Sequence, residues 1–247
     1  MRPDPERALE LRLAVAAGGA ILFLVPFALI AALIVGNSGW LHGSDLGVTT
    51  ALHDFALRHP GWVRFSAGWS FAFDPNVWRA AALGLVVWLA RRRSWALVWW
   101  VVVTMAAGGI LGVVLKLLVG RHRPDLLEPV ARASGFAFPS GHALNNALGA
   151  AVFVLVLLPL VTDRPRLRAG LWTAMVAIPL LTGLSRVLFG VHWTSDVVAG
   201  WLLGLAVVAA TAAAFLAGRR RSGPVNLAGR GLDPRLAEPA GAATRPK

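Results

Sequence analysis

The chain has 247 residues, 57% of them hydrophobic, with a mean hydropathy of +0.65 and a formal net charge of +12. This composition is too apolar for an ordinary soluble domain. Because the apolar residues lie in long runs, it predicts a polytopic membrane protein. Most of the excess positive charge lies in short loops and in the C-terminal tail, where the cytoplasmic preference of Lys and Arg accounts for it, so we expect no nucleic-acid partner. The absence of cysteine excludes disulfides and thiolate chemistry.

Six apolar runs are candidates for membrane-spanning helices. In chain order they are Ala14–Val35, Asn76–Ala90, Trp95–Leu118, His142–Val161, Leu171–Phe189 and Val197–Leu216. The first run, read as a helix of 22 residues, would be about 33 Å long. We therefore predict an all-α fold, a six-transmembrane-helix bundle over residues 11–218. It follows a short N-terminal tail, residues 1–10, and precedes a basic tail, residues 219–247, whose Pro, Gly, Ala and Arg content predicts disorder.

The segment Gly36–Pro75, between the first two runs, contains no predicted span. It is rich in Trp and Phe, which favour the headgroup layer of a membrane, and Leu46–Leu57 fits a short amphipathic helix. We therefore predict a short interfacial amphipathic segment between helices one and two. Its histidines, His42, His53 and His59, show no partner pattern, and we expect them to be interfacial as well.

The distribution of positive charge predicts how the chain is oriented. Six spans place both termini on the same side of the membrane. The N-terminal flank, the loops after the second and fourth spans, and the C-terminal tail together hold 16 of the 24 Lys and Arg residues. Both termini are therefore expected in the cytoplasm, in a multi-pass protein of the cell (inner) membrane. The end of span three, the start of span four and the junction of spans five and six then share the extracytoplasmic face.

Each of those three places carries unusual polar residues, and the first is Lys116–Pro124. Pro124 ends the third helix, so Arg123 lies at a fixed exit from the membrane. Lys116 lies about two turns deeper, where a cation needs a partner or a polar cavity. Arg121 could be a further phosphate contact or an interfacial side chain.

The second segment, Phe138–His142, opens the fourth span, and the third leads into the sixth span. Ser140 is a favoured N-cap residue, and Gly141 lets a ligand approach the free backbone N–H groups of a helix start, which bind anions. In the third segment His192 and Asp196 are four residues apart. On a helix this spacing would let the carboxylate hold the imidazole in one tautomer.

The three segments together suit a tetrahedral dianion. Lys116, Arg123 and Arg186 supply positive charge, and Arg makes bidentate contacts to phosphate oxygens. Two imidazoles, His142 and His192, on opposite sides of a phosphorus atom would suit a two-step displacement, in which one attacks and the other protonates the leaving oxygen.

The motifs Lys-x6-Arg-Pro, Pro-Ser-Gly-His and Ser-Arg-x5-His-x3-Asp resemble the three-part signature of the type 2 phosphatidic acid phosphatase superfamily. That group includes membrane lipid phosphate phosphatases, and its active-site design is similar to that of vanadium haloperoxidases and glucose-6-phosphatase. The resemblance covers spans three to six, about Ser94–Leu216, with the three motifs in order and at family spacing.

The resemblance implies a role for each motif residue. His192 would be the nucleophile that forms a phosphohistidine, Asp196 would orient it, and His142 would act as general acid and then as general base. The residues implied to hold the phosphoryl oxygens are Lys116, Arg123, Ser140, Gly141 and Arg186. No metal or other cofactor is expected, because two-metal hydrolysis needs clustered carboxylates and only Asp196 of the six acids on the predicted outer face lies in a motif.

These observations predict an integral membrane phosphatase that hydrolyses a lipid phosphate monoester or diphosphate at the extracytoplasmic face. Phosphatidic acid, phosphatidylglycerol phosphate and polyprenyl diphosphates are all candidate substrates, and the expected partners are this substrate and membrane lipids. A transporter or flippase of phosphorylated headgroups is the alternative, although binding alone would not require two histidines. A haloperoxidase-like vanadate site is disfavoured because those proteins lack this membrane architecture. The sequence indicates no oligomeric state.

Overall fold

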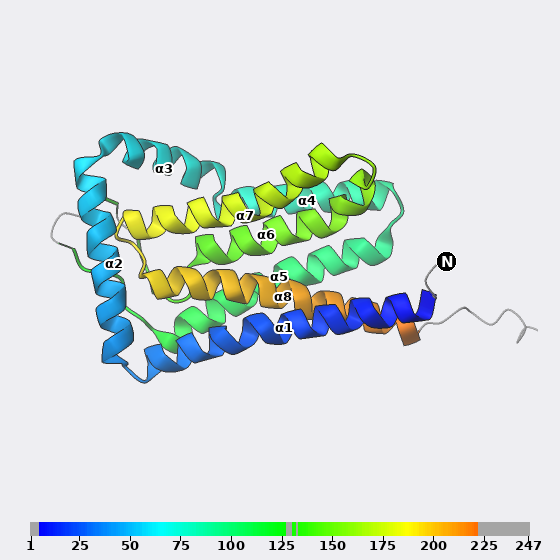
Figure 1. Cartoon of the computed structure of the whole chain (residues 1–247), viewed down its shortest axis with the longest axis horizontal. Coiled ribbons are helices and arrows are strands. Elements are labelled where there is room, and N and C mark those ends of the chain that lie inside the picture. Colours follow the sequence, from blue (N-terminus) through cyan, green and yellow to red (C-terminus); the bar gives the residue numbers. More distant parts are fainter. Residues whose placement is uncertain (1–4, 127–129, 132, 222–247) are drawn as a thin grey trace, which may run out of the picture.

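The computed structural model describes residues 5–126, 130–131 and 133–221. This part of the chain forms eight α-helices and one 3₁₀ helix, and no strand, which confirms the predicted all-α fold. The elements are α1 (Pro5–Val35), α2 (Gly39–Arg58), α3 (Pro60–Ala72), α4 (Pro75–Arg91), α5 (Trp95–Val119), α6 (Gly141–Leu157), η1 (Leu158–Val161), α7 (Pro165–Leu188) and α8 (Thr194–Arg221). In Figure 1 the long helices run along the long axis, and α2 crosses one end of the bundle.

Five helices of the described chain are long and apolar enough to cross a membrane: α1, α5, α6 with η1, α7 and α8. The remaining predicted span corresponds to α4, which packs against α5 and α6. Its 17 residues give about 26 Å of helix, shorter than the roughly 30 Å hydrocarbon core. The structure therefore supports a bundle with five spans, and the sixth stays a prediction.

The predicted tails are partly helical. Helix α1 begins at Pro5, inside the predicted N-terminal tail, and α8 runs on to Arg221. An ion pair of 2.9 Å between Glu10 and Arg220 joins these two helix ends. The remainder of the predicted C-terminal tail, residues 222–247, lies outside the described residues.

The segment between α1 and α4 contains two helices where the sequence predicts one short helix. Helix α2 is longer than the predicted Leu46–Leu57, and the residue before Pro60 ends it, because a residue preceding proline disfavours helical dihedral angles. One face of α2 packs on α7 and α8, and its buried residues are Asp45, Thr49, His53 and Ala56. His53 is 4% exposed, so its predicted interfacial position is wrong. This helix covers the end of the bundle.

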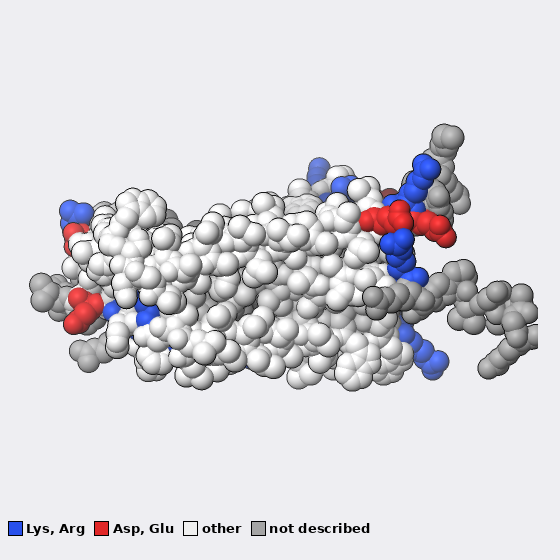
Figure 2. Space-filling view, turned by 90° about the horizontal axis from the view of Figure 1, so that it is seen from below, with Lys and Arg blue, Asp and Glu red and all other residues white. Residues whose placement is uncertain are grey.

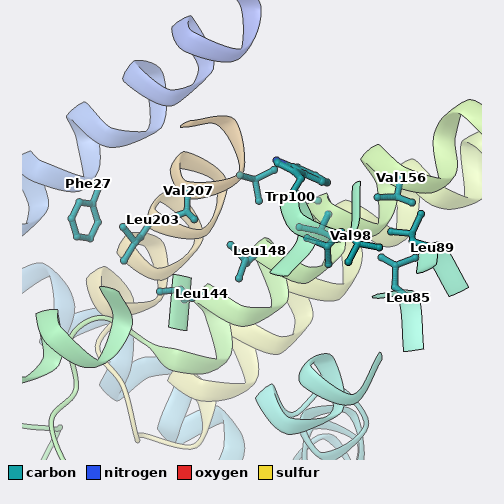
Figure 3. Close-up of a cluster of buried hydrophobic side chains, with 14 of the residues drawn as sticks. Phe27, Leu85, Leu89, Val98, Trp100, Leu144, Leu148, Val156, Leu203 and Val207 are labelled. Atoms are coloured by element: carbon teal, nitrogen blue, oxygen red, sulfur yellow. The ribbon is translucent and has the colours of Figure 1, made fainter. Parts of the chain in front are cut away.

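The outer surface of the bundle suits a lipid environment. The face seen in Figure 2 is uncharged along the length of the molecule, with Lys, Arg, Asp and Glu gathered near its two ends. Inside, one hydrophobic cluster joins α1, α4, α5, α6 and α8. Phe27, Leu144, Leu148, Leu203 and Val207 belong to it (Figure 3). The charged ends and the apolar middle agree with helices that cross a bilayer.

Helices α6 and α8 approach one another closely at two glycines. A Cβ atom on Gly204 would lie 2.7 Å from the carbonyl oxygen of Leu144, and one on Gly200 would lie 2.7 Å from that of Ser140. Small residues at such positions let helix backbones touch. The contact continues to the helix starts, where the Ser140 N–H donates to the Asp196 carbonyl at 3.0 Å. Backbone packing thus brings the second motif segment against the third.

Candidate active site

The three motif segments meet at the end of the bundle that α2 covers. The first leaves α5 through Gly120, whose left-handed conformation (φ +61°) ends the helix. The second is the start of α6. The third is the turn between α7 and α8, where Gly190 has a φ of +68°. Two helix ends and two helix starts therefore supply the polar residues of one site.

His192 lies in the turn before α8 and is 3% exposed. Its Nδ1 is 3.5 Å from Asp196 Oδ2, and its Nε2 is 3.1 Å from Arg123 Nη1. The two residues do not share a helix as their spacing suggests, because α8 begins only at Thr194. Asp196 Oδ2 also accepts a hydrogen bond from the Trp193 N–H at 2.9 Å. The carboxylate on the Nδ1 side favours the tautomer that leaves the lone pair on Nε2.

Burial controls the charge of His192. It lowers the pKa of His192 to about 4, although Asp196 acts in the opposite direction. The imidazole is therefore neutral at neutral pH, and the Nε2 lone pair is available to an electrophile. Burial also lowers the pKa of Arg123, again against the effect of Asp196.

Backbone carbonyls hold the two cations of the first motif. Arg123 donates to the carbonyls of Ser134, Gly135, Phe136 and Val191. Lys116 Nζ donates to the Phe136 carbonyl at 2.8 Å. The loop before α6 and the turn before α8 thus fix the Arg123 guanidinium beside the Nε2 atom of His192.

Several buried polar atoms at this end have no hydrogen-bond partner among the described residues. They include Oγ of Ser140, which is fully buried at the N-cap of α6, and Nε of Arg186. Arg186 does donate through Nη1 to Ser70 Oγ at 3.0 Å. A buried donor without a partner costs about 1–3 kcal/mol, so these atoms fit a bound anion. A phosphate group has the oxygens that would satisfy them.

His142 is the second residue of α6, and its Nε2 lies 3.4 Å from Asp74 Oδ2. Asp74 is the N-cap of α4, where its Oδ1 accepts the Asn76 N–H at 2.8 Å. His142 and His192 lie at the same end of the bundle, because the start of α6 is bonded to the first turn of α8 through the Ser140 N–H and the Asp196 carbonyl. Asp74 lies in no motif, and only its N-cap position before Pro75 marks it in the sequence.

Arg121 pairs with two carboxylates, a role that the sequence did not indicate. It is partly buried and forms ion pairs of 2.7 Å with both Asp45 and Asp196. Asp45 comes from α2 and was not identified as a site residue from the sequence. The sequence does contain a signal for a buried polar face on α2, because Asp45, Thr49 and His53 are spaced by four residues and lie on one side of the helix.

Among the described residues, His, Asp and Glu do not form a group of three or more that could hold a metal ion. The charged groups around His192 are instead the guanidinium of Arg123 and the carboxylate of Asp196, which Arg121 contacts in turn. The arrangement supplies positive charge for an anion and a neutral nitrogen nucleophile beside it.

The chain is similar to several known phosphatases. Residues 97–220 match the family model described as the PAP2 superfamily. Phosphatidylglycerophosphatase B of Bacillus subtilis is 37% identical over 99 residues, which are 39% of this chain and 47% of that protein. The chain thus aligns with about half the length of this relative. Decaprenylphosphoryl-5-phosphoribose phosphatase of Mycolicibacterium smegmatis is 32% identical over 178 residues, 69% of this chain and 77% of that one.

A solved structure has the same fold. The crystal structure of a transmembrane PAP2 type phosphatidylglycerolphosphate phosphatase from Bacillus subtilis matches with a TM-score of 0.64. The match covers 84% of this chain and 98% of that one at 24% sequence identity. The similarity therefore extends beyond the motif region to the overall arrangement of helices.

Proposed function

The chain belongs to the PAP2 superfamily, and we propose that it is an integral membrane phosphatase that hydrolyses a lipid phosphate monoester or diphosphate. One observation carries the proposal. The buried, neutral His192 holds its Nε2 beside the Arg123 guanidinium, with Asp196 on the opposite ring nitrogen. This is the arrangement of a nitrogen nucleophile next to the position of a phosphoryl group.

In the first step the Nε2 atom of His192 attacks phosphorus while the bond from phosphorus to the lipid-side oxygen breaks. His142, as an imidazolium, gives its proton to that departing oxygen. The products are a lipid alcohol, or a lipid monophosphate if the substrate is a diphosphate, and a phosphohistidine. Asp196 balances the positive charge that the His192 ring acquires.

In the second step water attacks the phosphohistidine. His142, now neutral, takes a proton from the water, the bond between phosphorus and nitrogen breaks, and its electron pair returns to Nε2 of His192. Inorganic phosphate leaves, and both histidines regain their starting protonation states. No step uses a metal ion, and we propose that the reaction is metal-independent.

Five residues would hold the phosphoryl oxygens, where negative charge is stabilised during both steps. They are Lys116, Arg123, Ser140, Gly141 and Arg186. The unpartnered Oγ of Ser140 and Nε of Arg186 support this assignment. Arg123 Nη1, which lies against the His192 Nε2 atom, would donate to a phosphate oxygen when substrate binds and so release the nucleophile.

We propose that the site faces the extracytoplasmic side and that both termini lie in the cytoplasm. The start of α1 and the end of α8 lie at one end of the bundle, and α2 with the motif segments lies at the other (Figure 1). The end with the start of α1 also carries the connection from α4 to α5 with its three arginines, residues 91–93. The preference of such loops for the cytoplasm supports this orientation.

Phosphate release from a panel of lipids tests the proposed function. We expect the purified protein in detergent to release phosphate from at least one of phosphatidic acid, phosphatidylglycerol phosphate, undecaprenyl diphosphate and decaprenylphosphoryl-5-phosphoribose, at the same rate with and without EDTA. The last substrate is that of the Mycolicibacterium relative. Folded protein that releases none would contradict the proposal. Transport of a labelled lipid phosphate in vesicles without hydrolysis would indicate the flippase alternative.

A groove between α4, α5 and α6 suits the lipid chain of such a substrate. It has a volume of about 660 Å³ and is lined mainly by apolar side chains, with Arg79 and Asn145 as its polar members. Asn145 is three residues after His142 on α6, and its Nδ2 donates to the Gly141 carbonyl at 2.8 Å, so one lining residue of the groove contacts the first turn of that helix. We propose that an acyl or prenyl chain lies in this groove while the phosphate occupies the site.

Filling the groove should lower activity on a long-chain substrate only. Gly109 lines the groove, and a Cβ atom there would meet open space, so Gly109→Phe places a ring in it. We expect kcat/KM for a long-chain lipid phosphate to fall roughly tenfold, the equivalent of about two buried methylene groups. Activity on a water-soluble phosphate monoester should be unchanged. Gly84→Phe, at an exposed glycine of α4 outside the groove, is the control. Equal effects of the two variants would exclude the groove.

A further inference from the structure

A second carboxylate lies behind the nucleophile, on the helix that covers the site. Asp45 of α2 is 2% exposed, and Asp196 is fully buried. Arg121 lies between them, with Nη2 2.7 Å from Asp45 and Nη1 2.7 Å from Asp196. Asp45 lies outside residues 97–220, the part of the chain that matches the family model, and outside all three motifs.

Asp45 is also bonded to the first turn of α8. The backbone N–H of Ser195 donates to Asp45 Oδ1 at 2.8 Å, and Ser195 Oγ donates to Oδ2 at 2.5 Å. Arg121 Nη1 donates to the same Ser195 Oγ at 2.7 Å. A carboxylate that accepts a free N–H at a helix start stabilises that helix end. Here the stabilised turn is the one that carries Asp196.

The division of hydrogen bonds around Asp196 leaves one of its oxygens for the nucleophile. Arg121 occupies Oδ1, whereas Oδ2 faces Nδ1 of His192 and accepts the Trp193 N–H. With Asp45 present, the group formed by two carboxylates and one guanidinium has a net charge of −1. Without it, Arg121 and Asp196 would form a neutral pair, and nothing in this group would balance a cationic His192 ring.

We propose that Asp45 is a positioning residue for the nucleophile. It binds the second end of Arg121, so that Asp196 keeps an uncompensated negative charge directed at His192. It also holds the turn of α8 that presents Asp196. The inference rests on the proposed function, because the charge matters when His192 becomes a phosphorylated, cationic imidazole. The cations Lys116, Arg123 and Arg186 are instead assigned to the phosphate oxygens.

The test separates this charge from the hydrogen bonds of the same side chain. Asp45→Asn keeps the size of the side chain and an oxygen that can accept the Ser195 N–H, but it removes the charge. We expect phosphoenzyme formation, measured by rapid quench with a ³²P-labelled lipid phosphate, to slow roughly tenfold to a hundredfold, the size of effect known for side chains that orient metal ligands. A rate within twofold of wild type would overturn the proposal.

A charge-balancing double variant provides the readout that a purely structural role would not give. Asp45→Asn combined with Arg121→Gln removes one negative and one positive charge and returns the group to −1. We expect the double variant to form phosphoenzyme at least fivefold faster than Asp45→Asn alone, although it has lost more hydrogen bonds. A double variant at or below the rate of the single variant would refute the charge role.

A matched pair covers the case in which Asp45→Asn does not fold. Asp45→Glu and Asp45→Gln have the same size and differ in charge, and the first should be at least tenfold faster than the second. Equal rates would overturn the proposal. Wild-type protein measured in parallel distinguishes the two levels of failure. Inactive wild type would reject the proposed function and this inference with it, whereas active wild type with indifferent Asp45 variants would reject this inference alone.

Discussion

Replacing His192 with alanine is expected to abolish phosphate release from lipid phosphates, with kcat at least about a thousandfold below that of wild type. The reason is chemical, because the substitution removes the only protein atom that forms a bond to phosphorus in the proposed mechanism. The measurement is malachite-green detection of phosphate in detergent with EDTA present. Wild-type protein quenched during turnover should also carry an acid-labile, alkali-stable phosphohistidine that His192→Ala lacks.

The matched control is His59→Ala. His59 is an exposed histidine between α2 and α3 that stacks on Phe55, with ring centroids 4.0 Å apart, and its Nδ1 is hydrogen-bonded to the Phe55 carbonyl oxygen at 2.8 Å. It should retain wild-type turnover. If His192→Ala keeps near-wild-type activity, the assigned nucleophile is wrong. If both histidine variants lose activity together with their melting transition, the loss reports folding instead of chemistry.

The second large effect is expected for His142→Ala. General acid or base catalysis is worth about a hundredfold to ten-thousandfold, and His142 would serve in both steps, so turnover of a lipid phosphate should fall by at least this factor. A substrate such as p-nitrophenyl phosphate releases a stable anion without protonation. With p-nitrophenyl phosphate, His142→Ala should therefore slow the first step much less than the second. Phosphohistidine should therefore accumulate in His142→Ala and be visible by rapid quench.

The neighbouring loop histidine provides the control for this experiment. The structure gives His122 a backbone role, in which its carbonyl accepts the Trp193 Nε1–H at 2.9 Å, so His122→Ala should build up no intermediate. If His142→Ala loses lipid and p-nitrophenyl phosphate activity equally and accumulates no phosphohistidine, His142 would belong to substrate binding and not to proton transfer. Asp74, 3.4 Å from the His142 ring, would then hold a binding group in place.

The helices around the three motifs could be predicted from the sequence because the local signals that start and end them are strong. Gly120 ends α5, before the predicted stop at Pro124, Ser140 starts α6, and the apolar runs on either side are long enough to require helices. Such signals depend on residues a few positions apart, so a single sequence contains them in full. The shorter α4 shows their limit, since length alone does not separate a short span from a helix packed inside a bundle.

What the sequence by itself determined was the helical class, the apolar spans and the residues that carry the proposed chemistry, because each depends on local spacing and residue type. Only the tertiary structure decided the partners of those residues. Asp45 is hydrogen-bonded to Ser195, which lies 150 positions further along the chain. The sequence of α2 indicates that the helix has a polar face, but it does not indicate which surface that face packs against. Arg121 was assigned by its motif to phosphate or interface, yet its two carboxylates meet only once α2 folds over the bundle end. Long-range ion pairs of this kind follow from packing, and no local pattern specifies them.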